Sequence, residues 1–126
     1  MELKNLVQIE VNSHDLIENT KALIYKGNAT LSNNQLDFMM NEQSYQFTKI
    51  GAHYITLNHH GEMEYALDLK PNTSFESNLV VSGYEVPIEC KCKKLVLHDD
   101  IWEIEYQIFQ MDSLLFHNHL TIHFNK

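Results

Sequence analysis

The stretch IWEIEYQIF, residues 101–109, decides the fold class of this protein. Its even-numbered positions are large and apolar (Trp102, Ile104, Tyr106 and Ile108), and the odd-numbered positions between them are polar (Glu103, Glu105 and Gln107). On a β-strand, successive side chains point to opposite faces of the sheet. The alternation therefore predicts a strand with one face in a core and the other face in water.

The same alternation occurs along most of the chain on both sides of this strand. It is present in ELKNLVQIEVN (residues 2–12), NQLDFMM (residues 34–40) and GEMEYALDL (residues 61–69). Each stretch predicts a half-buried strand. Because the predicted strands follow one another directly, we expect residues 1–126 to form a single all-β domain of about eight to ten strands.

Short turn signals separate the predicted strands. They are Asn33-Asn34, His60-Gly61, Lys70-Pro71-Asn72, His98-Asp99-Asp100 and Met111-Asp112-Ser113. The two consecutive asparagines suit the positive φ angles of a tight type I′ hairpin turn. Consecutive strands with short turns favour an antiparallel up-and-down barrel over a sandwich, because closure of the barrel removes the free edges of the sheet. Pro87, inside a predicted strand, indicates a sheet edge or a bulge.

One segment, SHDLIENTKALIYKG (residues 13–27), also fits a helix. Apolar residues recur in it at helical spacing, Ser13 or Asp15 is a candidate N-cap, and Gly27 is a candidate stop. On local grounds, a short helix and a strand fit this segment equally well.

The composition narrows the functional classes. The chain has 126 residues, a formal net charge of −8 and a pI near 5.3. A surface this acidic repels phosphate backbones and anionic lipid headgroups, so we expect neither nucleic-acid nor membrane partners. No apolar run is long enough to cross a membrane, and the alternating N-terminal stretch differs from a signal peptide. We therefore expect a cytoplasmic protein.

The two cysteines, Cys90 and Cys92, are separated by one residue. On a strand their side chains point the same way, and a disulfide between them would distort the backbone. Two thiolates are also too few for a structural zinc site, which has four ligands. Both cysteines are therefore predicted to be reduced thiols that face the core.

From about Thr20 to Phe124 the succession of strands resembles the YwiB-like proteins, uncharacterised bacterial β-barrels of the calycin (lipocalin-like) type. The matching pieces are GNATLSNNQLDFMMNE, GEMEYALDL, TSFESNLVVSGYEVPIECKCKKL, WEIEYQIF and NHLTIHF, in that order. The resemblance covers about four-fifths of the chain and implies a fold without an activity. It implies a strand from Lys21 to Leu31. It also leads us to expect threonines where this chain has Cys90 and Cys92.

Three histidines lie in FHNHLTIHF, residues 116–124. Alternation points His117, His119 and His123 outward, and His123 lies about 13 Å beyond His119 along an extended strand. With a turn at residues 111–113, Glu105 falls opposite His119, and cross-strand Glu–His pairing explains the histidines without a metal. We predict no metal site and no cofactor. A metal-binding protein or an enzyme that uses the His117/His119 face is the alternative.

The chain contains no catalytic motif such as G-x-S-x-G or H-E-x-x-H, so the sequence favours a non-enzymatic protein without deciding the matter. The predicted inward face combines apolar side chains with aromatic rings, several of which carry a polar tip. The aromatic residues expected there are Phe38, Phe47, Tyr65, Tyr84, Trp102, Tyr106, Phe116 and Phe124. Asn118 is a lone amide among them and requires a hydrogen-bond partner.

Our leading hypothesis is that the barrel interior binds a small hydrophobic or aromatic molecule. Tyr84, Tyr106 and Asn118 are the candidates for orienting this ligand, and Trp102 is the candidate wall against which it stacks. Two alternatives stay open. The core is filled and Asn118 is hydrogen-bonded internally, or the protein is an interaction scaffold, with a homodimer formed through a barrel edge or face.

Overall fold

The computed structural model describes residues 5–125, which form ten antiparallel strands and no helix. The strands are β1 (Asn5–Asp15), β2 (Thr20–Ser32), β3 (Gln35–Met40), β4 (Gln43–Gly51), β5 (Tyr54–His60), β6 (Met63–Leu69), β7 (Thr73–Val81), β8 (Tyr84–Leu97), β9 (Ile101–Gln110) and β10 (Ser113–Asn125). Each strand pairs with the next one, and β10 pairs with β1. The predicted up-and-down barrel is therefore confirmed. Residues 5–125 contain no helix long and apolar enough to span a membrane.

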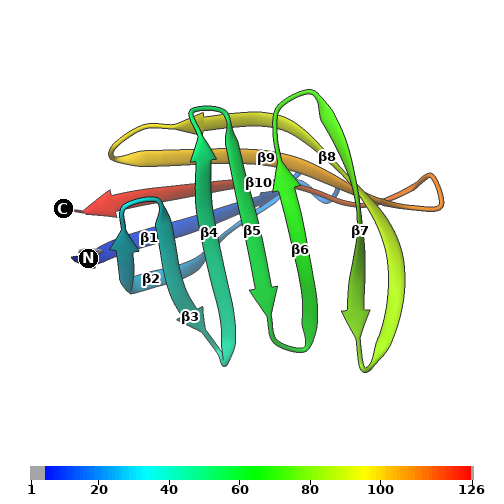
Figure 1. Ribbon diagram of the computed structural model, residues 1–126, viewed down its shortest axis with the longest axis horizontal. Coiled ribbons are helices and arrows are strands. Elements are labelled where there is room, and N and C mark those ends of the chain that lie inside the picture. Colours follow the sequence, from blue (N-terminus) through cyan, green and yellow to red (C-terminus); the bar gives the residue numbers. More distant parts are fainter. Residues whose placement is uncertain (1–4, 126) are drawn as a thin grey trace.

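The barrel consists of two sets of strands that cross at a large angle. In Figure 1, β3 to β6 run roughly vertically in front, β1, β9 and β10 run roughly horizontally behind them, and both chain ends lie at the same side. The longest strands bend from one set to the other. Register shifts mark bulges at Lys93 of β8, opposite β9, and at Ile24 of β2, opposite Val11 and Asn12 of β1, and a bulge increases the local bend of its strand.

The core follows the alternation of the sequence. In β9 the four even-numbered residues Trp102, Ile104, Tyr106 and Ile108 are buried, as predicted, and Glu103, Glu105 and Gln107 between them are partly exposed. Cys90 and Cys92 are free and buried, so the predicted inward thiols are confirmed. Burial raises the pKa of both thiols, to about 12 for Cys90 and about 11 for Cys92, so they stay protonated near neutral pH.

The ambiguous segment forms a turn and a strand rather than a helix. Residues 16–19 form the turn between β1 and β2, so the strand from Lys21 to Leu31 is confirmed. Oδ1 of Asp15 accepts hydrogen bonds from the backbone N–H of Ile17 (2.9 Å) and Glu18 (3.2 Å). Asp15 thus caps a turn in the way it would have capped a helix. Pairing of β2 along the whole of β1 outweighs the local helical spacing.

Two details of the turns and edges depend on tertiary context. Asn33 and Asn34 form the turn between β2 and β3, but neither has a positive φ, so the expected type I′ geometry is wrong. Consecutive positive φ angles occur instead in three other hairpin turns, at Asn41-Glu42, Ser82-Gly83 and Met111-Asp112. Pro87 pairs with Asn78 of β7, whereas pairing of β8 with β9 begins only at Glu89. The proline therefore lies at a local sheet edge, as predicted.

The contact between β6 and β7 is the most weakly paired seam of the barrel. Backbone pairing there is confined to Met63 with Val81 and Glu64 with Val80. Farther along the seam, the Ser77 hydroxyl donates a hydrogen bond of 2.7 Å to the carbonyl oxygen of Ala66. A side chain thus takes the place of a main-chain bond at this point of the sheet.

Candidate functional site

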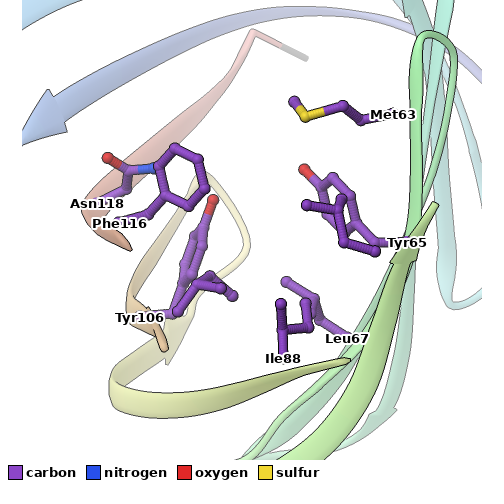
Figure 2. Close-up of a pocket in the computed structure, with 9 residues that line it drawn as sticks. Met63, Tyr65, Leu67, Ile88, Tyr106, Phe116 and Asn118 are labelled. Atoms are coloured by element: carbon purple, nitrogen blue, oxygen red, sulfur yellow. The ribbon is translucent and has the colours of Figure 1, made fainter. Parts of the chain in front are cut away.

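A cavity of about 140 Å³ lies in the barrel interior, beside the weak seam. Five consecutive strands, β6 to β10, supply its walls. The lining residues are Met63, Tyr65, Leu67, Leu79, Ile88, Tyr106, Ile108, Phe116 and Asn118 (Figure 2). None of these nine residues carries a formal charge, so the cavity presents apolar surface together with two hydroxyls and one amide.

The cavity has an apolar floor and a polar mouth. Leu67 and Ile88 at the floor are buried, whereas Met63 and Phe116 are 39% and 43% exposed and mark the open end. Figure 2 shows Met63 and Tyr65 on one side of the cavity and Phe116, Asn118 and the ring of Tyr106 on the other. The hydroxyl groups of both tyrosines point to the end of the cavity at which Met63 and Phe116 lie. Polar groups therefore gather where a bound molecule would meet solvent.

Both tyrosines keep their protons near neutral pH. Burial raises the pKa of Tyr106 to about 12, and a side-chain hydrogen bond with Asn118 opposes that rise. Burial also raises the pKa of Tyr65, and the neighbouring Tyr106 adds to the effect. A protonated phenol donates one hydrogen bond and accepts others. The two hydroxyls are consequently available as neutral donors at the mouth of the cavity.

A buried histidine supports one wall of the cavity from behind. His59 on β5 is only 2% exposed, and its Nδ1–H donates to the carbonyl oxygen of Met63 (2.7 Å). Its Nε2 lies 2.9 Å from the side-chain amide of Gln43 and, in the neutral ring, accepts a hydrogen bond from the amide N–H group, and its ring stacks on Tyr65 with centroids 4.8 Å apart. Burial lowers the pKa of His59 and favours the neutral ring. His59 thus fixes both the backbone of Met63 and the ring of Tyr65.

His59 was not among the predicted site residues, although its position in the sequence contained a signal. In YITLNHH, residues 54–60, Ile55, Leu57 and His59 share one face by alternation. An imidazole on an otherwise apolar inward face needs partners for its nitrogens, and here they come from Met63 and Gln43.

The structure brings two of the four predicted ligand-binding residues together and places the other two elsewhere. Tyr106 and Asn118 both line the cavity. Tyr84 is 75% exposed, so its expected inward position is wrong. It shares a strand face with the buried Ile88, but the first residues of β8 extend beyond the pairing with β9. Where the neighbouring strand is missing, the inward face of β8 has nothing to pack against.

Trp102 is buried, as predicted, but it does not line this cavity. Its ring packs edge-on against Phe124 (centroids 5.1 Å apart) and Phe47 (6.5 Å), near the turn between β8 and β9. Trp102 precedes Tyr106 by four positions, which corresponds to about 13 Å along a strand. The ring walls of the cavity are instead Tyr65, Tyr106 and Phe116, all three of which were expected to face inward.

The histidine strand is engaged in pairs with glutamates. Nε2 of His117 lies 2.8 Å from Oε2 of Glu105, and Nε2 of His119 lies 3.5 Å from Oε1 of Glu103. The predicted cross-strand Glu–His pairing is therefore confirmed. Within residues 5–125, no group of three His, Cys, Asp or Glu side chains is placed to hold a metal ion.

The fold is similar to that of a solved structure, the crystal structure of the ywiB protein from Bacillus subtilis. The two structures align with a TM-score of 0.66 and 10% sequence identity, over 98% of this chain and 94% of that chain. At this identity the likeness concerns the fold alone. No protein-family model matches the chain, and no curated protein gives a significant match.

Proposed function

We propose that this protein binds a small hydrophobic or aromatic molecule inside the barrel and is not an enzyme. The observation that carries the proposal is the cavity of about 140 Å³, with its apolar floor and with the polar groups of Tyr65, Tyr106 and Asn118 in its wall, the two hydroxyls pointing to the open end. An engineered apolar cavity of about 150 Å³ in another protein binds benzene. A single six-membered ring therefore matches the space, and polar substituents of the ligand can project through the mouth.

The chemistry of the lining favours binding over catalysis. General acid–base catalysis works best with groups whose pKa lies near the operating pH. The titratable groups that line the cavity are Tyr65 and Tyr106, and burial moves the pKa of both away from neutrality. Their hydroxyls suit recognition of a ligand better than transfer of its protons.

We also infer that this chain is a YwiB-like protein of the calycin type and that it acts in the bacterial cytoplasm. Three observations support this inference: the likeness of fold to the ywiB protein, the acidic composition and the two free, buried cysteines. Reduced thiols are common in cytoplasmic proteins and rare in oxidising compartments.

The test is a titration with benzene, in which binding is measured by backbone NMR chemical-shift changes and by the change in melting temperature. We expect saturable shifts at the lining residues and a rise in melting temperature at saturation. Leu79→Phe directs a ring into the cavity and should abolish both responses. Val80→Phe, at the next position and on the opposite face of β7, is the matched control and should retain them. Benzene binding that survives Leu79→Phe, or no saturable binding to the folded wild-type protein, would overturn the proposal.

A further inference from the structure

We propose that the ligand is an uncharged molecule that places an apolar ring at the floor of the cavity and presents a hydrogen-bond acceptor, such as a carbonyl oxygen, to the hydroxyls of Tyr65 and Tyr106 at the mouth. This inference rests on the proposed function. It adds the class of the ligand and the direction in which the ligand lies.

The orientation follows from the uneven distribution of polar atoms. Leu67, Ile88 and Ile108 are buried and offer no hydrogen bond from their side chains. Both tyrosine hydroxyls point away from this floor toward Met63 and Phe116 (Figure 2). A ligand that lay the other way round would bury its polar group among aliphatic side chains, where that group would lose its hydrogen bonds to water without replacement. The apolar end of the ligand therefore goes in first.

The requirement for an acceptor follows from the hydrogen bonding of the two phenols. The Tyr106 hydroxyl lies beside the Asn118 side chain, and a phenolic oxygen can accept a hydrogen bond from an amide N–H while its own hydrogen stays available. The hydroxyl hydrogen of Tyr106 is then left to donate to a ligand. Tyr65 makes no hydrogen bond through its hydroxyl within residues 5–125, so this group is a second free donor. Two donors converge at one end of the cavity.

The requirement for neutrality follows from the missing counter-charges. A buried carboxylate needs a cation beside it, and a buried ammonium needs an anion. The nine lining residues supply neither. The net charge of −8 further disfavours the approach of an anion. Neutral donors in an uncharged cavity are matched instead by a carbonyl, an amide or an ether oxygen.

The experiment compares four molecules that share one benzene ring. Acetophenone carries a neutral acceptor, ethylbenzene replaces its carbonyl by a methylene, benzoate is an anion, and benzylamine is a cation near neutral pH. Isothermal titration of each probe into the full chain gives four dissociation constants. We expect acetophenone to bind about three- to tenfold more tightly than ethylbenzene, which corresponds to one or two net hydrogen bonds. It should bind more than about tenfold more tightly than either ion.

Variants then assign the preference to the tyrosines. Tyr106→Phe should reduce the advantage of acetophenone over ethylbenzene to less than about twofold while ethylbenzene binding is retained. Tyr65→Phe tests the same prediction at the second donor, so the test survives if one variant fails to fold. Tyr84→Phe, an equally conservative change at an exposed residue outside the cavity, should leave all four constants unchanged.

The outcomes separate this inference from the proposed function. If ethylbenzene and acetophenone bind equally well, or if benzoate binds as tightly as acetophenone, the cavity binds rings but the inferred ligand class is wrong. The class is equally wrong if both folded tyrosine variants keep the full preference for acetophenone. If none of the four probes binds to the folded wild-type protein, the proposed function fails, and this inference fails with it.

Discussion

The carboxylate of Glu105 lies 2.8 Å from Nε2 of His117, although the backbone partner of Glu105 across the sheet is His119. His119 in turn contacts Glu103 rather than the glutamate directly opposite it. Both pairs are diagonal, and diagonal neighbours on adjacent strands lie within reach of long side chains. Each histidine therefore lies beside a different carboxylate of β9, and His117 hydrogen-bonds to its carboxylate whereas His119 only contacts the other one.

This arrangement predicts weak metal binding and no dependence of the fold on metal. Zinc or nickel should bind at micromolar concentrations or above, because two imidazoles without a third ligand from the described residues make an incomplete site. Treatment with a chelator should leave the melting temperature unchanged. A metal that is retained through purification in chelator, and lost in the His117→Ala, His119→Ala double variant, would contradict this prediction and favour the metal-enzyme alternative.

Trp102→Ala should be among the most destabilising single substitutions. The ring is buried between Phe47 and Phe124, and its removal leaves a cavity that a closed barrel cannot easily collapse. We expect a loss of about 3–5 kcal/mol in the free energy of unfolding, measured by urea denaturation. Tyr84→Ala, which removes a largely exposed ring, is the control and should cost less than about 1 kcal/mol. A loss below about 1 kcal/mol for Trp102→Ala would mean that the inward face of β9 is assigned wrongly.

His59 should make the stability of the protein fall as the medium becomes acidic. Burial lowers the pKa of His59 in the folded protein below its ordinary value of 6.5. As the pH falls through about 6.5, the unfolded chain binds a proton at this residue before the folded chain does, so the free energy of unfolding decreases. The free energy of unfolding stops decreasing once the pH is below the pKa of His59 in the folded protein. Above about pH 7, His59 contributes no pH dependence to the free energy of unfolding.

The measurement is urea denaturation at a series of pH values for wild type and His59→Gln. The variant should lose part of the acid-side slope, while His53→Gln, at an exposed turn position, should retain the wild-type slope. Identical slopes in wild type and His59→Gln would show that His59 is not responsible.

The seam between β6 and β7 should open more readily than the rest of the barrel. Because backbone pairing there is confined to two residue pairs, amide hydrogens of the neighbouring part of β6 should exchange faster than those of β9. Ser77→Ala removes the hydrogen bond to the Ala66 carbonyl and should cost about 0.5–1.5 kcal/mol. Ser74→Ala, at an exposed position of the same strand, is the control. Uniform exchange rates across β6 and β9 would refute the idea of a weak seam.

The fold was predictable because the alternation of inward and outward side chains along a strand produces an alternation of apolar and polar residues in the sequence. The alternation in IWEIEYQIF correctly assigned all four inward residues of β9. Glu105 lies opposite His119, as predicted, although the expected three-residue turn at 111–113 is wrong: the turn has two residues, Met111 and Asp112, and a bulge at Leu115 restores the register. Both inferences use only residues that are close in sequence. The choice between helix and strand for residues 13–27 was different, because the local signals were balanced and pairing with β1 decided it.

The site was only half predictable, because a cavity depends on contacts that the sequence does not display. Alternation gives the direction of Tyr84 and Trp102 but not their neighbours. Tyr84 lies in the part of β8 that extends beyond its pairing with β9. Trp102 lies where Phe47 and Phe124 fill the interior. Tyr106 and Asn118 were identified because they are adjacent in the register of one hairpin. The walls from β6 and β7 come from distant parts of the sequence and could not be assigned to the same space.

The pairing of β1 with β10 has a consequence for how the chain matures in the cell. Among the ten strands, β1 leaves the ribosome first and β10 last, and eight residue pairs among the described residues join them, from Gln8 with Asn125 to Asp15 with Asn118. Until β10 emerges, the nascent sheet of nine strands has two unpaired edges, and unpaired edges invite association with other chains. The newly made chain is therefore protected from aggregation only when β10 pairs with β9 and β1 and closes the barrel. Truncation before β10 should produce inclusion bodies rather than a smaller soluble protein.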